Sequence, residues 1–245
     1  MYHSIDESGS AISVGRDVFR AHVRWLASGR VRVVPLEELM SGDPSADAVA
    51  LTFDDAFANF ATEAAPLLLE HRLPVTLFVV SDRAGMTNAW GGYHSPGIPT
   101  LPLLDWVALG RLAQDGITLG GHTRTHPRLA GMSQAALADE IGGSAERIQA
   151  ECGVRPGAFA YPYGAYDAAA ARAVAGTYRV GCTTELRLIG KSERSHLLPR
   201  LDMYYYQQDG RLEAWGDRSF HWRLLIRARA RALRQAISPA WKGRQ

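Results

Sequence analysis

Two short segments of the chain carry residue types that bind metal ions and move protons. Thr52–Asp55 ends in adjacent carboxylates, Asp54 and Asp55, and His122–His126 places two imidazoles four residues apart. Adjacent carboxylates repel each other and cost desolvation, so a bend at the strand end, or a cation, must let both reach one site. Two histidines at this spacing lie on one face of a helix, which suits a shared metal ion.

Each segment has a simpler interpretation when it is taken alone. An aspartate before Phe57 could cap a helix, and the histidine pair could lie on the surface. Together, however, Asp55, His122 and His126 offer a ligand set that leaves open positions on zinc or a similar divalent ion. Asp54 is then available to take a proton from water. The combination predicts a metal-dependent hydrolase with Asp54 as its general base.

A third segment, Phe159–Gly164, runs from an apolar strand into Pro-Tyr-Gly, where the backbone must turn sharply. The N–H of Tyr163 is predicted to be free to donate, as a group that stabilises an oxyanion must be. A plain turn with tyrosines in the core would give the same sequence.

In this order, the three segments resemble the motifs of the polysaccharide deacetylase family, the NodB-homology group or carbohydrate esterase family 4. The similarity covers about residues 1–205, including 33–39 and 198–202. It implies a distorted (β/α)7-type barrel that removes acetyl groups from N-acetylated, sometimes O-acetylated, sugars. By the same implication Asp54 is the base, Asp55, His122 and His126 bind zinc (cobalt or nickel in some members), and the Tyr163 amide holds the oxyanion.

The chain departs from the family pattern at two places. Many members have an arginine in the third motif that orients the catalytic aspartate, and Ala160 stands at the matching position. The late histidine motif that supplies a general acid is not found either. Tyr2-His3-Ser4-Ile5 resembles an element of the poly-N-acetylglucosamine deacetylase-like branch, which makes His3 the candidate acid. That branch also implies that the first strand, which normally precedes this element, is missing here.

Two aromatic residues are candidates for contact with a sugar. Trp90 lies in the long irregular segment 81–101, where it could stack on a sugar ring or anchor the loop. Tyr161, in the third motif, is the second candidate.

The elements that must position these residues alternate along the chain, as short β-branched runs and longer helical patterns. The predicted strands are Val31–Pro35, Ala48–Phe53, Val75–Val80, Ile117–Gly120, Ala158–Tyr161, Arg179–Thr183 and Leu197–Leu201. The predicted helices are Val18–Ser28, Phe57–His71, Pro102–Asp115, Ser133–Glu151, Asp167–Ala175 and Trp222–Ile237. This alternation predicts an α/β fold with a parallel sheet, open or closed into a barrel. The three motifs each follow a strand, so they should gather at one end of the sheet.

Composition fits a globular protein, with 245 residues, 47% of them hydrophobic, and a formal net charge of +2. We expect a catalytic domain over residues 1–210 and a basic helical tail over 211–245, because eight Lys or Arg and no acidic residue follow Asp217. The tail is predicted to pack on the barrel through Leu224, Leu225 and Leu233, and peripheral contact with a membrane is a further expectation. Nucleic acid is not expected as a partner, because the basic residues do not extend into the body.

Other features bear on location and redox state. No signal peptide is recognised, so the chain as given is expected to be cytoplasmic or peripheral to a membrane. The two cysteines, Cys152 and Cys182, are expected to be buried thiols.

The predicted function is metal-dependent hydrolysis of acetamide groups on N-acetylated sugars of a polysaccharide or glycan. One alternative is a glycan-binding protein of the same fold that is weakly active or inactive, which Ala160 and the missing first strand favour. Another is a hydrolase that uses the same metal site on non-sugar C–N bonds.

Overall fold

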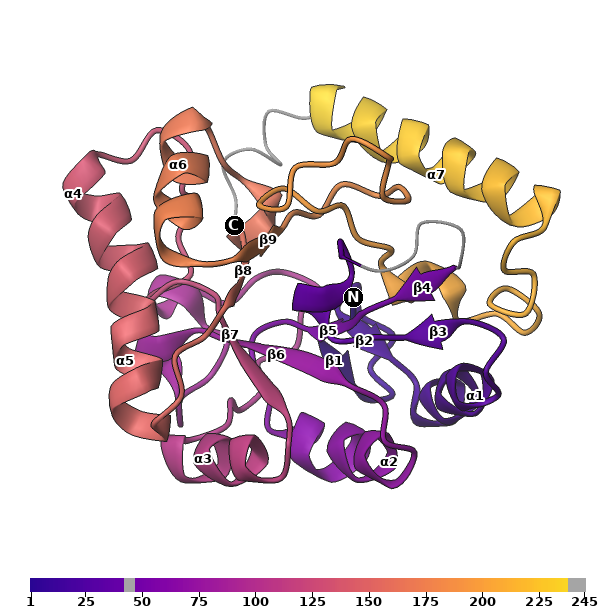
Figure 1. Cartoon of the computed structure of the whole chain (residues 1–245), viewed down its shortest axis with the longest axis horizontal. Coiled ribbons are helices and arrows are strands. Elements are labelled where there is room, and N and C mark those ends of the chain that lie inside the picture. Colours follow the sequence, from indigo (N-terminus) through magenta and orange to yellow (C-terminus); the bar gives the residue numbers. More distant parts are fainter. Residues whose placement is uncertain (42–46, 238–245) are drawn as a thin grey trace.

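A five-stranded parallel sheet forms the centre of the molecule in a computed structural model that describes residues 1–41 and 47–237 (Figure 1). Its strands follow one another in chain order: β5 (Leu51–Phe53), β6 (Val75–Val79), β7 (Thr118–Gly121), β8 (Ala158–Ala160) and β9 (Val180–Cys182). All five residues of β6 are buried. Strands covered on both faces read as continuous apolar runs, which explains the sequence pattern.

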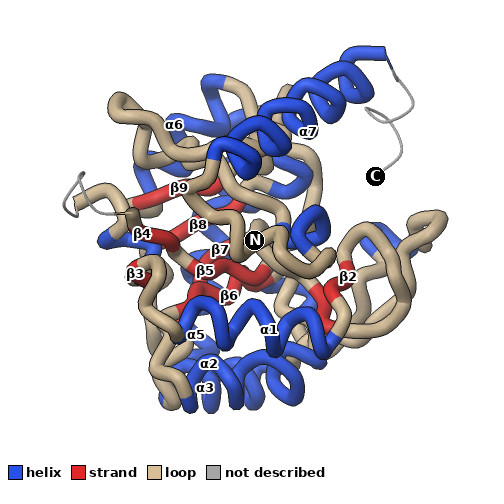
Figure 2. The backbone as a smooth tube through the Cα atoms, turned by 90° about the vertical axis from the view of Figure 1, so that its right-hand side faces the viewer, coloured by secondary structure: helices blue, strands red, loops and turns tan. Residues whose placement is uncertain are grey.

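Helices surround this curled sheet (Figures 1 and 2). They are α1 (Arg16–Ala27), α2 (Ala65–Glu70), α3 (Trp106–Gln114), α4 (Gln134–Leu137), α5 (Gly143–Cys152), α6 (Ala168–Thr177) and α7 (Arg218–Ile237). Two further short pairs of strands, β1 (Ser4–Ile5) with β2 (Ser13–Val14) and β3 (Arg32–Val33) with β4 (Ala48–Val49), lie beside the main sheet. The predicted α/β fold with a curled parallel sheet is confirmed.

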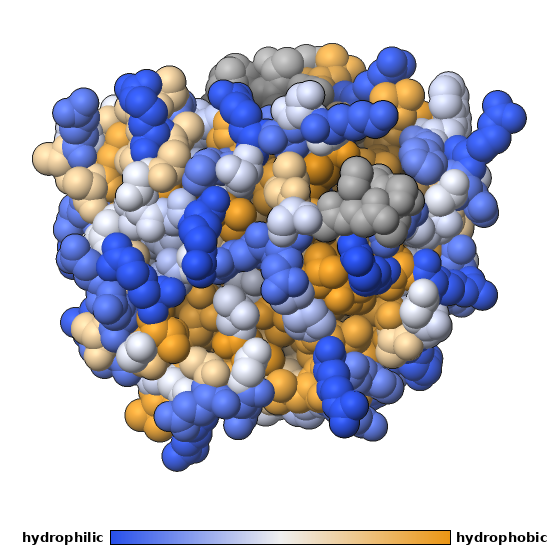
Figure 3. Space-filling view, in the orientation of Figure 1, coloured by the Kyte–Doolittle hydropathy of each residue, from blue (hydrophilic) through white to orange (hydrophobic). Residues whose placement is uncertain are grey.

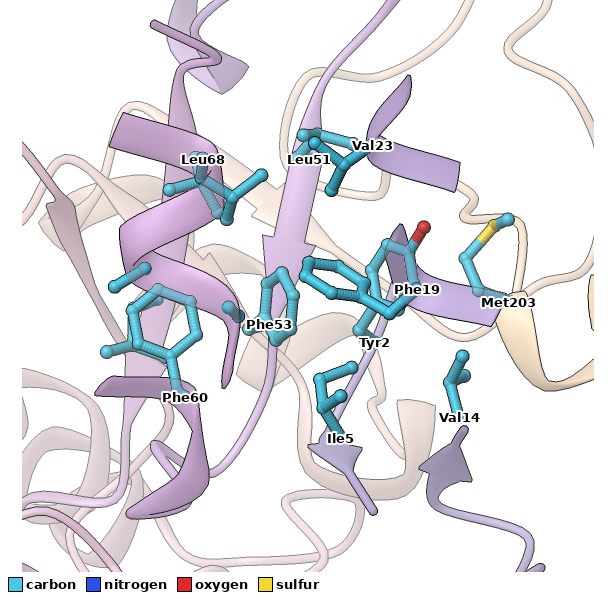
Figure 4. Close-up of a cluster of buried hydrophobic side chains, with 14 of the residues drawn as sticks. Tyr2, Ile5, Val14, Phe19, Val23, Leu51, Phe53, Phe60, Leu68 and Met203 are labelled. Carbon is cyan, nitrogen blue, oxygen red and sulfur yellow. The ribbon is translucent and has the colours of Figure 1, made fainter. Parts of the chain in front are cut away.

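The N-terminal residues lie next to β5 and complete the core. Tyr2 forms a parallel bridge with Phe53, and their rings stack with centroids 4.9 Å apart (Figure 4). On the other side, the α-amino group of Met1 donates to the carbonyl of Leu201, and Met203 N–H donates to the carbonyl of Met1. Because Leu198 in turn bridges Cys182 of β9, backbone contacts run all the way around the barrel.

A cavity of about 280 Å³ lies at this junction. It is lined mainly by apolar side chains and includes Met1, Leu51, Leu198 and Leu201 in its wall. The cavity thus lies beside β5, next to the parallel bridge between Tyr2 and Phe53.

Several predicted elements differ in detail. The predicted strand Ala48–Phe53 is divided, because β4 pairs with β3 whereas β5 pairs with β6. The predicted helix Phe57–His71 begins with a π-helical segment at Phe60–Ala64 before α2. Leu197–Leu201 contributes one bridge rather than a strand.

The predicted packing of the tail was wrong in part. In α7, Leu224 is buried as expected, but Leu225 and Leu233 are 42% and 60% exposed, whereas Phe220 is buried. The division into two domains at residue 210 stays a prediction.

Candidate active site

Asp54 and Asp55 follow β5 at a sharp bend. Asp55 and Ala56 both have positive φ angles, 72° and 56°. Non-glycine residues rarely adopt this conformation, and such strain is concentrated at functional sites. Both aspartates are buried, and neither is the N-cap of the helical segment that follows, which begins at Phe60 after Asn59. The bend instead lets two neighbouring carboxylates reach one site.

The two histidines follow β7 in a loop, so the helical conformation that would put them on one face is not the one they adopt. His122 to His126 form a loop in which Thr123 and His126 have positive φ angles of 66° and 67°. Within the loop, His126 N–H donates to Thr123 Oγ1 over 3.0 Å. The backbone N–H groups of Arg124 and Thr125 both donate to one oxygen of Glu140, a buried carboxylate. Glu140 therefore fastens the loop that brings the histidines together.

Asp55, His122 and His126 converge as a possible metal site. One ligand atom from each lies within 4.8 Å of the others, and all three residues are buried. Asp55 Oδ1 is 3.4 Å from the Nε2 atom of each histidine. Within the described part of the chain, this oxygen is a buried acceptor without a hydrogen-bond donor. Buried polar atoms are nearly always paired, so an acceptor facing two imidazole nitrogens fits a cation between them.

The protonation states of these groups also suit a cation. Burial opposes ionisation of Asp55, but the neighbouring histidines hold the pKa of its carboxyl below the ordinary value. Burial lowers the pKa of His126 to about 3, so that its imidazole is neutral at pH 7. Burial also opposes the charge on His122, but the Asp55 and Asp54 carboxylates raise its pKa. A metal that binds here must therefore displace any proton on His122.

The outer nitrogen of each histidine is held by a hydrogen bond. His122 Nδ1 is 2.7 Å from the carbonyl oxygen of Ala160, and His126 Nδ1 is 2.8 Å from the hydroxyl of Tyr163. Such contacts fix the ring orientation and leave Nε2 facing the ligand position. Trp90 stacks on the other side of His126, with ring centroids 4.3 Å apart and an interplanar angle of 26°.

Asp54 lies beside this cluster and is bound by a residue that sequence reasoning did not identify. Arg200 donates two parallel hydrogen bonds to the Asp54 carboxylate, at 2.6 and 2.8 Å. Its guanidinium also donates to Thr183 O and Thr52 Oγ1 and lies over the ring of Phe78. Burial disfavours the charge on Asp54, but Arg200 and the nearby histidines hold the pKa of this carboxyl well below its ordinary value. The positive charge that Ala160 does not provide is thus supplied to Asp54 by Arg200.

His3 also faces Asp54. Its Nε2 atom is 3.8 Å from Asp54 Oδ2, and its side chain is 21% exposed, so it borders both the carboxylate and solvent. The Tyr2–Phe53 bridge next to it sets this position.

The two tyrosines of the third motif have different positions. Tyr163 lies in a short turn with φ 59° and reaches His126. Tyr161 is fully buried against Phe159 and Tyr166, which contradicts its predicted contact with substrate. In the described part of the chain its hydroxyl has no hydrogen-bond partner.

Arg200 and Glu140 are the residues that sequence reasoning missed. Arg200 stands in a largely apolar stretch, LLPRLD at 197–202. A charged residue in such a context was the available signal. Glu140 lies in a predicted helix and carried no such signal.

Comparison with known proteins agrees with this geometry. The family model described as polysaccharide deacetylase matches residues 41–179. The protein YxkH of Bacillus subtilis, named among the polysaccharide deacetylases, is 27% identical over 82% of this chain and 69% of its own length. A chitooligosaccharide deacetylase of Rhizobium leguminosarum is 32% identical over 49% of this chain; the match spans 46% of that protein, about half its length.

Solved structures show the same fold. IcaB from Ammonifex degensii superposes with a TM-score of 0.72 at 19% identity, over 87% of this chain and 94% of its own. The Streptococcus pyogenes deacetylase PplD, in complex with acetate, gives a TM-score of 0.67 at 20% identity, over 82% of this chain and 88% of its own. The barrel type expected from the sequence is therefore confirmed. The chain belongs to the polysaccharide deacetylase family, whose members hydrolyse N-acetyl amide bonds.

Proposed function

We propose that this protein is a metal-dependent deacetylase that hydrolyses acetamide groups of N-acetylated sugars in a polysaccharide or glycan. The observation that carries the proposal is the convergence of Asp55, His122 and His126 on one point beside Asp54. We propose zinc as the metal, with cobalt or nickel as alternatives, because a carboxylate and two imidazoles are ligands that suit all three.

When bound, such an ion supplies the positive charge that polarises an acetyl carbonyl and lowers the pKa of water. Asp54 accepts the proton of the attacking water as general base. A carboxylate with a lowered pKa is a weak base. It can still accept a proton from water whose own pKa a bound ion has lowered. Arg200 occupies one position on each Asp54 oxygen, and each oxygen keeps a second acceptor position for that water.

The remaining steps use groups around this centre. The backbone N–H of Tyr163 donates to the developing oxyanion. His3 protonates the departing amine, and its position between Asp54 and solvent supports that role. The half-buried Trp90 offers an aromatic edge beside His126 to a sugar ring.

The alternative of an inactive glycan-binding protein was favoured by Ala160 and by the missing first strand. The pairing of Arg200 with Asp54 removes the first of these two reasons. Hydrolysis of a non-sugar C–N bond would use the same groups. Only a comparison of activity on different substrates can distinguish it from sugar deacetylation.

The test measures acetate release from N-acetylglucosamine oligomers by the zinc-loaded protein, together with its metal content. Asp54→Asn should abolish turnover and keep the metal, whereas His126→Ala should lose both. Asp115→Asn, which changes an exposed carboxyl on the far end of α3, is the control and should keep both. Retention of most activity by Asp54→Asn would refute the assignment of the base. Activity on small amides or aryl acetates alone would favour the non-sugar hydrolase, and oligomer binding without acetate release would favour the binding protein.

A further inference from the structure

Helix α7 is held to the body of the protein by one of its faces. Phe220 and Leu224 are buried, at 3% and 7% exposure. The guanidinium of Arg227 lies 5.0 Å from the ring centroid of Tyr205, and Arg231 is 3.9 Å from a carboxylate oxygen of Asp202. This inner face accounts for the attachment of the helix.

The opposite face of α7 is apolar and exposed. We define the outer apolar face as Trp222, Leu225, Ile226 and Leu233, which are 63%, 42%, 51% and 60% exposed. Trp222, Ile226 and Leu233 follow the i, i+4, i+11 spacing that lines one side of a helix. Large apolar side chains that are scattered singly on a surface are ordinary, whereas four on one face of one helix indicate a contact surface.

The charge of this helix has one sign. Arg218, Arg223 and Arg229 are exposed, and residues 218–237 include no aspartate or glutamate. By helical spacing, Arg218 and Arg229 lie on the same side as Trp222. The outer apolar face is thus interleaved with positive charge. In Figures 1 and 2 α7 lies at the periphery of the molecule, and Figure 3 shows hydrophobic and hydrophilic side chains together over its region.

We propose that the outer apolar face of α7 docks on an anionic lipid bilayer, with the helix lying parallel to the membrane surface. Helices of this kind bury an apolar face at the level of the headgroups while arginines meet lipid phosphates and tryptophan lies at the interface. Among the described helices, none is long and apolar enough to cross a membrane. A second copy of the chain fits less well, because a symmetric contact would bring Arg218 and Arg229 against like charges.

The test measures cosedimentation of the full chain with phosphatidylcholine vesicles that contain or lack phosphatidylglycerol. We expect binding to the anionic vesicles and little to the neutral ones. Raising the salt concentration to about 1 M should weaken the binding, because the screening length falls from about 8 Å to about 3 Å.

Two variants of α7 have matched controls on α3, where Val107 and Arg111 are also exposed. Ile226→Ser and Arg229→Glu should each lower the vesicle partition coefficient at least about fivefold. Val107→Ser and Arg111→Glu should leave it unchanged. Thermal unfolding of all four variants checks that each is folded.

Three results would overturn the proposal. They are absence of binding to anionic vesicles, equal losses in the α3 and α7 variants, and sedimentation velocity showing a dimer that Ile226→Ser dissociates. The last would assign the surface to a second copy. None of these outcomes depends on the hydrolase activity.

Discussion

The buried pair of Arg200 and Asp54 allows a quantitative test of how the site is built. Both side chains are at most 5% exposed, and Arg200 donates two short hydrogen bonds to the carboxylate. Removing one partner leaves an uncompensated buried charge, which costs about 3–5 kcal/mol of unfolding free energy. The two charge-assisted hydrogen bonds alone, at about 1.5–3 kcal/mol each, give a similar sum. We therefore expect Arg200→Met to lose about 3–5 kcal/mol at pH 7 in metal-free protein.

The assay is urea denaturation with a chelator present, analysed by linear extrapolation. Arg187→Met is the matched control, because Arg187 also pairs with carboxylates but is 43% exposed. A surface pair of this kind contributes about 0–1 kcal/mol. The double variant Arg200→Met with Asp54→Asn removes both charges, so it should lose less than the sum of the two single variants.

The same pair sets a dependence on pH. In the wild type the pKa of Asp54 is lowered from 3.8, so its contribution to stability is present above that value and is lost as pH falls through the lower folded pKa. In Arg200→Met the unpaired, buried carboxyl has a raised pKa and is neutralised at higher pH. The difference in unfolding free energy between wild type and variant should therefore begin to shrink as the pH falls through the raised pKa of the variant, and should go on shrinking until the pH reaches the lowered pKa of the wild type. Additive single variants, or a loss no larger than that of Arg187→Met, would refute the interpretation of the pair as a buried counter-ion.

Two further predictions concern Tyr163, which contacts a proposed metal ligand, and Gly120 in strand β7. Tyr163→Phe removes the hydroxyl that contacts His126 Nδ1 and should weaken zinc binding about 10–100-fold in competition with a chromophoric chelator. Tyr161→Phe, which removes an unpaired hydroxyl two residues away, should not change the affinity, and equal losses in both variants would contradict this role. Gly120→Ala would place a Cβ 2.4 Å from the ring of Phe78 and should cost about 1–3 kcal/mol of stability. Gly176→Ala in α6 meets open space and should be neutral or stabilising in the same denaturation experiment, whereas a matching loss there would refute the packing explanation.

The sequence was sufficient to predict the five strands of the main sheet and the proposed metal ligands, because both depend on local patterns. Buried parallel strands are continuous apolar runs, and Asp55, His122 and His126 occur in short motifs. How the two histidines meet was left open, however. His-x3-His spacing favours a helix, whereas the observed loop depends on positive φ at Thr123 and on a carboxylate at residue 140.

What sequence could not predict depends on pairs of residues far apart in the chain. Arg200 and Asp54 are 146 positions apart, and no local pattern links them. Sequence also could not distinguish the two tyrosines of the third motif, Phe159–Gly164. Tyr161 and Tyr163 have similar sequence contexts, but the first directly follows the buried strand β8 and the second lies inside the turn at Pro162–Gly164, so only the second contacts His126.

The order in which the chain is synthesised gives the position of Arg200 a further meaning. Every proposed metal ligand has been made once the ribosome has passed His126, long before residue 200. A nascent chain of that length would have the means to hold an ion but not the guanidinium that keeps Asp54 ionised. The segment around Arg200 is the last part of the barrel to be synthesised, and it completes both the barrel wall and the charge balance of the site. Hydrolysis should therefore begin only when the whole catalytic fold is in place.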